Sequence, residues 1–275
     1  MQETEDPRRH TRGPSRLAAR WLGHATVVIA LDGARLITDP VLGTRVGPLR
    51  RVASPVAADA ASDVDAILLS HLHADHADRR SLRAFSSATP VLAPAGAGRW
   101  LSGRGFSNVC ELLPGEHAEV AGVRVLATPA NHRPGRWRER PGVTPIGFVA
   151  SASQAAYFAG DTDLFEQMAS LAGTIDLALL PVGGWGPTLG PGHLDPARAA
   201  EAARLIAPRV AVPIHWGTLA APWALRVRGA HPSPAELFAE LAAERAPEVD
   251  VRVLAPGELL ELDGARRGAT VEKGI

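Results

Sequence analysis

The sequence contains a single cysteine, Cys110, among its 275 residues. One cysteine cannot close an intrachain disulfide, and it excludes a zinc site built from several thiolates. Histidine is the commonest alternative ligand for a metal ion, and the chain contains 10 histidines. Any metal site in this protein must therefore be built mainly from histidine and carboxylate side chains.

An excess of charge is also missing, because 29 basic residues balance 29 acidic ones. Proteins that bind nucleic acids without sequence preference use a positive excess, so this balance argues against a specific nucleic-acid partner. No run of 18 apolar residues occurs, and the sequence therefore predicts no transmembrane helix. The amino-terminal segment lacks the apolar stretch of a secretory signal, so we expect a cytoplasmic protein.

The two ends of the chain are polar, and we expect residues 1–15 and 265–275 to be flexible tails. Between them, residues 16–264 contain neither a repeat nor a linker-like stretch. Hydrophobic residues make up 46% of the chain, which is enough to build an ordinary globular core. A single domain over 16–264 is therefore expected.

Short apolar runs separated by turn residues predict strands along most of the chain. One long strand is expected over 17–31, followed by a hairpin turn at Asp32 and Gly33. Further strands are expected at 35–38, 64–69, 90–93, 109–112, 119–127, 146–151, 155–158, 177–181, 210–214 and 251–254. Helices are expected at 76–85, 164–172, 196–206 and 233–245. This order favours an α/β fold with two packed sheets and helices outside them.

Three histidines and one aspartate lie within six residues, in the run Leu69-Ser70-His71-Leu72-His73-Ala74-Asp75-His76. This run directly follows an apolar strand, where the chain turns and side chains can converge. His71 and His73 are two residues apart, so they point to the same side of an extended chain. Imidazole and carboxylate ligands suit zinc, iron or manganese, and the run therefore predicts a metal site.

Residues 71–76 resemble the HxHxDH motif of the metallo-β-lactamase superfamily. Later strands are followed by His132, Asp161 and His215, in the order that this superfamily shows. The segments 21–26, 38–40, 192–196 and 214–218 resemble the branch that contains N-acyl-phosphatidylethanolamine-hydrolysing phospholipase D. The ascorbate-6-phosphate lactonase type is a more distant relative. The resemblance implies the metallo-β-lactamase fold, which is a four-layer αββα sandwich.

The resemblance also implies two divalent metal ions, with zinc favoured over manganese or iron. Seven residues are the expected ligands: His71, His73 and His132 for one ion, Asp75, His76 and His215 for the other, and Asp161 as the bridge. Such sites ionise a bridging water near neutral pH, and the resulting hydroxide serves as the nucleophile.

Asp75 and His193 are the candidate catalytic residues. The resemblance makes His193 face the cleft and bind or protonate the leaving group; a surface histidine before a capped helix is the alternative. Asp39 is expected to orient a metal-bound histidine, with a plain Asp-Pro turn as the alternative. His24 is either a hydrogen-bonded core histidine or a residue that lines the cleft.

The loop after His132 contains four arginines and one tryptophan. Arg133 and Arg136 are candidate substrate residues because guanidinium groups match phosphate oxygens, and a solvated charged loop is the alternative. The segment 219–225, which contains Trp223, would allow peripheral contact with a membrane.

The expected function is metal-dependent hydrolysis of a phosphodiester, in a phospholipid or a phosphorylated small molecule. The alternative is a lactonase or a thioester or ester hydrolase, because the same nucleophile attacks either centre. A nuclease is disfavoured by the zero net charge. A metal-binding protein without catalysis is disfavoured because the set of seven ligands is complete.

Overall fold

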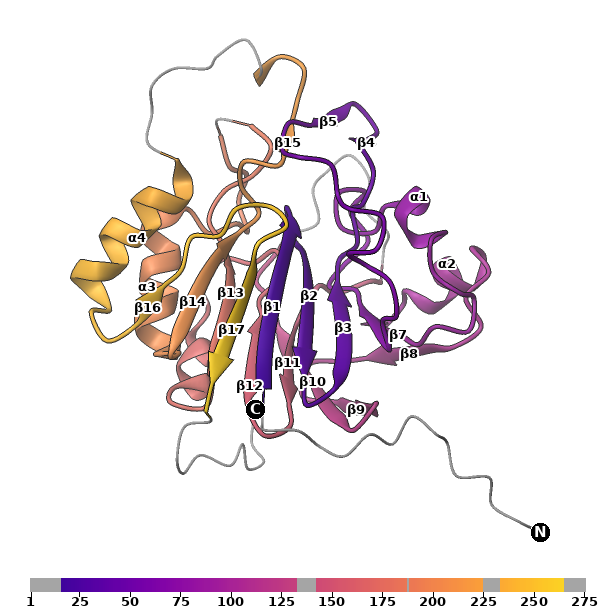
Figure 1. Ribbon diagram of the computed structural model, residues 1–275, viewed down its shortest axis with the longest axis horizontal. Helices are drawn as coiled ribbons and strands as arrows, with labels where there is room; N and C mark the ends of the chain where they lie inside the picture. Colours follow the sequence, from indigo (N-terminus) through magenta and orange to yellow (C-terminus); the bar gives the residue numbers. More distant parts are fainter. Residues whose placement is uncertain (1–15, 133–141, 187, 225–232, 265–275) are drawn as a thin grey trace.

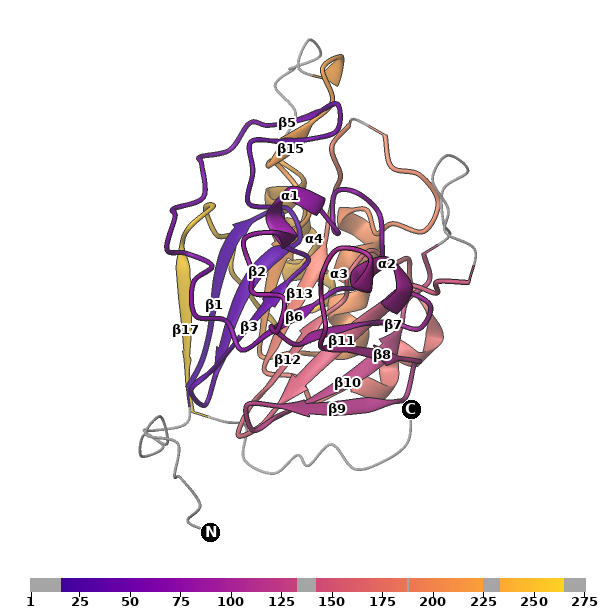
Figure 2. The ribbon, with the colours of Figure 1, turned by 90° about the vertical axis from the view of Figure 1, so that its right-hand side faces the viewer.

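The computed structural model describes residues 16–132, 142–186, 188–224 and 233–264. The expected tails and the candidate substrate residues Arg133 and Arg136 lie outside these ranges. Within them, two seven-stranded sheets face one another and helices lie against their outer faces (Figure 1). Figure 2, turned by 90°, shows the two sheets from the side. This arrangement confirms the predicted αββα sandwich.

The first sheet has the strand order β17-β1-β2-β3-β6-β7-β8. Its strands are β1 (Arg16–Gly23), β2 (Thr26–Leu31), β3 (Ala34–Thr38), β6 (Ala66–Leu68), β7 (Val91–Pro94), β8 (Val109–Leu112) and β17 (Leu259–Asp263). The strands β3, β6, β7 and β8 pair in parallel. Their carboxyl ends therefore share one edge of the sheet.

The second sheet has the order β16-β14-β13-β12-β11-β10-β9. Its strands are β9 (His117–Val120), β10 (Val123–Pro129), β11 (Ile146–Ser151), β12 (Ala155–Phe158), β13 (Leu177–Pro181), β14 (Val210–Ile214) and β16 (Asp250–Val251). The strands β12, β13 and β14 are parallel, and β10 runs the same way because β11 is antiparallel to both β10 and β12. The carboxyl ends of all four thus lie at one edge.

Helices cover the outer face of each sheet. The first sheet carries α1 (Arg79–Leu82) and α2 (Gly98–Ser102), and the second carries η1 (Glu166–Leu171), α3 (Pro196–Ile206) and α4 (Pro234–Arg245). A small third sheet joins β4 (Arg45–Val46), β5 (Leu49–Arg51) and β15 (Leu219–Ala220), above the large sheets in Figure 1. None of the helices in the described ranges is long and apolar enough to cross a bilayer.

Alternating side chains build separate cores on the two faces of the central strands. In β13, Leu177 and Leu179 join the core between the sheets, whereas Ala178 and Leu180 join the core under α3 and α4. Both faces of this strand are covered, which explains its continuous apolar sequence. Each fully buried leucine contributes roughly 1.5–3 kcal/mol, so these cores fix the positions of the strand ends.

Helix caps follow the predicted chemistry at two places. The Asp195 carboxylate accepts a hydrogen bond from the Arg198 backbone N–H at the start of α3. Ser233 and Glu236 cap α4 reciprocally. α3 has the predicted bounds, and α4 begins one residue later than predicted, after its cap Ser233. The starts are predictable because the cap residue and the following proline act locally.

The single strand predicted over 17–31 is wrong, because the chain turns between β1 and β2. Gly23 has φ 108° and His24 has φ 52°, and these left-handed conformations end β1. The alternating apolar pattern continues through the turn because both strands are buried, so periodicity could not reveal the break.

Several other boundaries also differ from the predictions. The helix predicted at 76–85 is only the four-residue α1, and 164–172 contains the 3₁₀ helix η1. The strand predicted at 119–127 divides into β9 and β10, around a turn in which Ala121 and Gly122 have positive φ. The last strand is β17 rather than 251–254, and α2, β4, β5 and β15 were not predicted. These elements are short or stabilised by tertiary contacts, so local pattern carries little information on them.

Candidate metal centre

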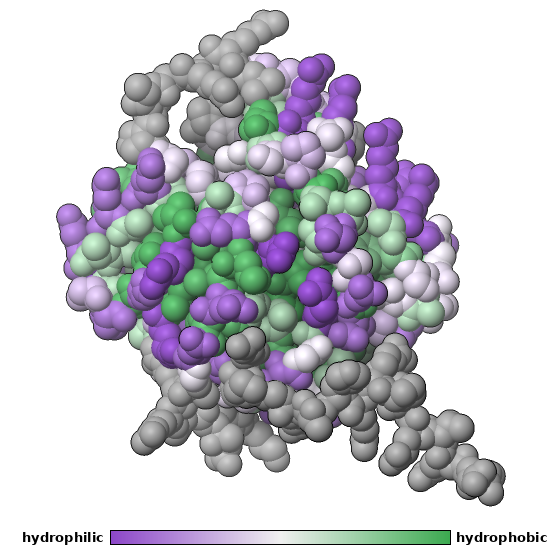
Figure 3. Space-filling view, viewed as in Figure 1, coloured by the Kyte–Doolittle hydropathy of each residue, from purple (hydrophilic) through white to green (hydrophobic). Residues whose placement is uncertain are grey.

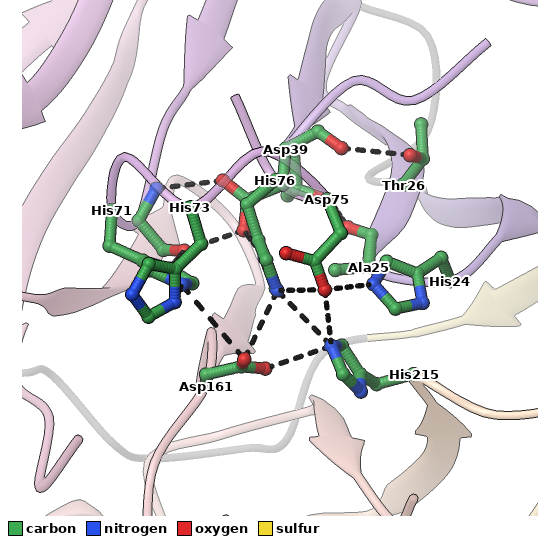
Figure 4. A network of polar contacts seen from close by, with 12 residues as sticks. His24, Ala25, Thr26, Asp39, His71, His73, Asp75, His76, Asp161 and His215 are labelled. Carbon is green, nitrogen blue, oxygen red and sulfur yellow. Dashed lines mark hydrogen bonds and ion pairs between the residues drawn. The ribbon is translucent and has the colours of Figure 1, made fainter. Parts of the chain in front are cut away.

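The seven predicted ligands come together at one end of the sandwich, where the carboxyl ends of strands from both sheets lie. The run from His71 to His76 follows β6, and His132, Asp161 and His215 follow β10, β12 and β14. In Figure 4 the side chains of His71, His73, His76, Asp161 and His215 point toward a common centre. Parallel strand ends at one edge explain how residues far apart in the sequence converge.

Three imidazoles form a first group, which contains His71, His73 and His132. His73 Nδ1 lies 2.9 Å from His71 Nε2 and 3.2 Å from His132 Nε2. In a tetrahedral zinc site with Zn–N distances near 2.05 Å, neighbouring nitrogens lie about 3.3 Å apart. The spacing of these three nitrogen atoms therefore fits the ligands of one metal ion.

A second group contains Asp75, His76 and His215, together with His24. His76 Nε2 lies 3.1 Å from His215 Nε2. The Asp75 Oδ2 atom lies 3.9 Å from His76 Nε2 and 4.0 Å from His215 Nε2. Two imidazoles and one carboxylate thus face the same point, which suits a second cation.

Asp161 lies between the two groups. Its Oδ2 atom is 3.1 Å from His76 Nε2 and 3.9 Å from His71 Nε2, and its Oδ1 atom is 3.2 Å from His215 Nε2. The buried Oδ1 atom accepts no hydrogen bond within the described part of the chain. A buried carboxylate oxygen without a hydrogen bond is costly, and a bridging position between two cations would satisfy it.

Asp39 is linked by hydrogen bonds to one imidazole of each group, on the side of the ring that faces away from the centre. Its Oδ2 atom accepts hydrogen bonds from His76 Nδ1 at 2.7 Å and from Ser70 Oγ at 2.5 Å. The Ser70 hydroxyl in turn accepts from His71 Nδ1 at 2.9 Å. Both imidazoles therefore donate through Nδ1 and direct Nε2 toward the centre.

Two backbone carbonyls orient His132 and His215 in the same way. His132 Nδ1 donates to the Gly192 carbonyl at 2.8 Å, and His215 Nδ1 donates to the Gly183 carbonyl at 2.8 Å. The glycine-rich loop 183–193 thus holds one histidine from each group. This pattern of outer hydrogen bonds is typical of histidines that bind metals through Nε2.

The electrostatics of the site also fit metal ligation. Burial lowers the pKa of four imidazoles, those of His71, His73, His132 and His215. For His132 the pKa falls to about 4. Burial also opposes the charged form of His76, but the Asp161 and Asp39 carboxylates raise its pKa well above the usual value. Neutral imidazole is the form that binds a metal, so the donor set is largely ready for cations.

His24 lies inside the centre and contacts a predicted ligand. It is 1% exposed, and its Nε2 atom lies 3.2 Å from Asp75 Oδ2. Burial lowers the pKa of His24 to about 3, so a neutral imidazole donates this hydrogen bond. The His24 backbone carbonyl accepts from the His215 N–H at 2.9 Å, which ties the β1–β2 turn to the end of β14.

Three residues of the site have left-handed backbone conformations. The φ angles are 52° at His24, 30° at Asp39 and 63° at His215. Such angles are unfavourable for residues other than glycine, and they concentrate where a side chain must be aimed. The turns that end β1, β3 and β14 therefore direct these three side chains into the centre.

His193 lies at the open side of the centre, with 22% of its side chain exposed. Its Nε2 atom is 3.3 Å from Asp161 Oδ2, and its Nδ1 atom is 3.0 Å from the Gly190 carbonyl oxygen. Both neighbours are acceptors, so both ring nitrogens carry protons. Burial acts against this charge, but the hydrogen bond with Asp161 raises the pKa of His193.

Sequence reasoning missed Ser70 and the two carbonyl acceptors at Gly183 and Gly192. Ser70 directly precedes the first histidine of the motif, and its hydroxyl could have been recognised as a hydrogen-bond partner for a neighbouring ligand. The carbonyls carry no signal in the sequence, because any residue supplies one. Trp223, from the segment predicted to contact membranes, is 51% exposed, while the end of that segment lies outside the described ranges.

Comparisons with known proteins agree with this geometry. A family model described as a beta-lactamase superfamily domain matches residues 34–216. The N-acyl-phosphatidylethanolamine-hydrolyzing phospholipase D 1 of Caenorhabditis elegans is 31% identical over 234 residues, which cover 74% of this chain and 65% of the worm protein. A UPF0173 metal-dependent hydrolase of Caldivirga maquilingensis is 32% identical over 249 residues, which cover 88% of this chain and 97% of that protein.

A solved structure shows the same fold. Igni18, a metallo hydrolase from the archaeon Ignicoccus hospitalis, superposes with a TM-score of 0.68 and 23% identity, over 91% of this chain and all of that one. The matched region of the family model contains all seven converging histidines and aspartates. The resemblance noted in the sequence is thus confirmed, and the chain belongs to the beta-lactamase superfamily domain family, within the metallo-β-lactamase superfamily.

Proposed function

We propose that this protein is a metal-dependent hydrolase of phosphodiesters, acting on a phospholipid or a phosphorylated small molecule. The observation that carries the proposal is the pair of ligand groups with the Asp161 carboxylate between them. Two adjacent cation sites suit the displacement of one oxygen by another at phosphorus. The name of the Caenorhabditis elegans relative, a phospholipase D, also supports a phosphodiester substrate.

Two divalent cations are part of this proposal, one held by His71, His73 and His132 and the other by Asp75, His76 and His215. Zinc is favoured, and manganese or iron suits the same nitrogen and oxygen donors. When bound, such cations lower the pKa of a water molecule and stabilise negative charge on phosphoryl oxygens.

The side chains around the ligands have separate tasks. Asp39 holds Nδ1 of His76 and, through Ser70, that of His71, which fixes the orientation of both rings. Asp75 Oδ2 accepts a hydrogen bond from His24 Nε2, which fixes the orientation of the carboxylate. His193 carries a proton at Nε2 on the exposed side of Asp161, where it can protonate the oxygen that leaves phosphorus.

The test is hydrolysis of bis(p-nitrophenyl) phosphate by purified protein that has been stripped of metal and reloaded with Zn²⁺ or Mn²⁺. The variant His71→Ala serves as the blank, because it lacks one ligand of the first group. Turnover that returns with metal and is absent from the blank is the expected result. A protein that instead hydrolyses p-nitrophenyl acetate or a lactone, and leaves the diester intact, would contradict the proposal in favour of a carbonyl substrate.

A further inference from the structure

We propose that a pocket lined by arginines, beside the metal centre, binds a second phosphate group of the substrate. This inference rests on the proposed function, since it takes the scissile phosphodiester to lie at the metal centre. It narrows the substrate class to a phosphodiester that carries another phosphate. We call this depression, which has a volume of about 1170 Å³, the arginine pocket.

Five arginines line the arginine pocket: Arg79, Arg80, Arg83, Arg99 and Arg104. They come from α1 and its C-cap, from α2 and from the turn that follows α2. In Figure 3, hydrophilic side chains gather at the upper right, over the part of the molecule where Figure 1 shows α1. The whole chain has no net charge, so this concentration of positive charge is local.

Most of these guanidinium groups have no counterion in the structure. Those of Arg79, Arg80, Arg83 and Arg99 form no ion pair or hydrogen bond with any other described residue. Arg79 begins α1 and Arg83 is its C-cap, four residues later, a spacing at which like charges destabilise a helix. This repulsion does not stabilise the fold, whereas a bound anion would offset the positive charge.

Among the described residues, Asp78 is the one acidic side chain that lines the pocket, and it is already engaged. The Asp78 carboxylate accepts hydrogen bonds from Ser81 N at 3.0 Å and from Ser81 Oγ at 2.6 Å, and it caps α1. The Ser81 hydroxyl also accepts from the Leu42 N–H at 2.8 Å, which fastens α1 to the loop after β3. Asp78 thus caps an anchored helix and forms no ion pair with the described arginines of the pocket.

The remaining wall of the pocket is apolar and aromatic. Trp100 is 7% exposed, and the Arg104 guanidinium lies 3.6 Å from the centroid of its ring. A volume of this size accommodates a small molecule rather than an extended polymer. Guanidinium forks match phosphate oxygens, so the pocket suits a compact phosphorylated molecule with an apolar portion.

The pocket adjoins the metal centre through the ligand motif itself. Leu72 and Ala74 line the pocket, and they alternate in sequence with the ligands His71, His73 and Asp75. A smaller depression of about 340 Å³ shares Asp78 and Arg80 with it and adds Arg45. None of the ligands themselves lines the pocket, so the proposed substrate would cross this run, with one phosphate among the arginines and another at the ligands.

The test is residue-resolved modification of arginines by phenylglyoxal, using the full-length, metal-loaded protein with and without inorganic phosphate. Mass spectrometry after cleavage at acidic residues gives the modification rate at each arginine. We expect phosphate to slow the modification of Arg79, Arg83 and Arg99 by about fivefold. Arg20, an exposed arginine of β1 outside the pocket, should react at an unchanged rate. Equal rates at Arg99 with and without phosphate, or equal protection of Arg20, would overturn the inference.

A double variant sharpens the test. In R79Q/R83Q, phosphate should no longer protect Arg99, whereas in R20Q the protection should persist. Vesicles of phosphatidylcholine with phosphatidic acid, compared with phosphatidylcholine alone, identify a lipid headgroup as the source of the phosphate if only the former protect Arg99. Because the readout requires no turnover, protection without diester hydrolysis contradicts the proposed function alone, and hydrolysis without protection contradicts this inference alone.

Discussion

The Asp39 carboxylate lies 2.7 Å from Nδ1 of His76, and through the Ser70 hydroxyl it also reaches Nδ1 of His71. One buried side chain therefore sets the orientation of an imidazole in each ligand group. This single connection makes the two groups interdependent, because a change at Asp39 releases both rings.

The substitution Asp39→Asn should lower metal affinity and activity together by about 10- to 100-fold, because an amide supports the imidazoles less well than a carboxylate. Metal content after dialysis and the rate of diester hydrolysis measure the two effects. Asp176→Asn is the matched control, since Asp176 is also buried and bonded to Ala155 N but lies at the opposite end of β13. Wild-type metal content in Asp39→Asn would exclude the orienting role.

The substitution Asp161→Ala should remove the link between the two ligand groups and lower activity by about two orders of magnitude or more. The bound metal per chain should fall as well, which elemental analysis can measure. His76 should also become easier to deprotonate, because the Asp161 carboxylate contributes to its raised pKa. Retention of both activity and metal content would contradict the two-metal assignment.

The substitution His193→Ala should lower the turnover number by about 10²- to 10⁴-fold and leave the metal content unchanged, because His193 supplies a proton and is not among the expected ligands. A substrate with a good leaving group, such as p-nitrophenolate, should show a smaller loss than one with an alkoxide leaving group. If metal content falls in step with turnover, His193 has a structural role instead.

The convergence of the seven candidate ligands could be predicted from the sequence, whereas the groups that orient them could not. The run 71–76 places four candidate metal ligands after a single strand, so a local sequence pattern is enough to predict a metal site. Ser70 and Asp39 meet only because β3 and β6 are parallel neighbours, which periodicity does not specify. The arginine pocket was missed because α2 is too short to give a helical pattern, so nothing indicated that its arginines lie beside those of α1.

His24 shows most clearly how a long-range contact escapes sequence analysis. It interrupts an apolar stretch, which left a core histidine and a cleft residue equally open. The turn at φ 52° directs its side chain to Asp75, a residue 51 positions away. No pattern in residues 17–31 contains that information.

The substitution His24→Asn should weaken metal binding at the Asp75, His76 and His215 group by about 10- to 100-fold, and should affect the other group less. Asparagine tolerates the left-handed backbone of this position, so the loss reports the missing hydrogen bond to Asp75 rather than strain. A metal titration of the stripped protein should therefore show two binding steps whose affinities differ more than they do in the wild type. His117→Asn, at an exposed histidine of β9, is the control and should titrate as the wild type does. Equal weakening of both steps in His24→Asn would instead indicate that the β1–β2 turn supports the whole centre.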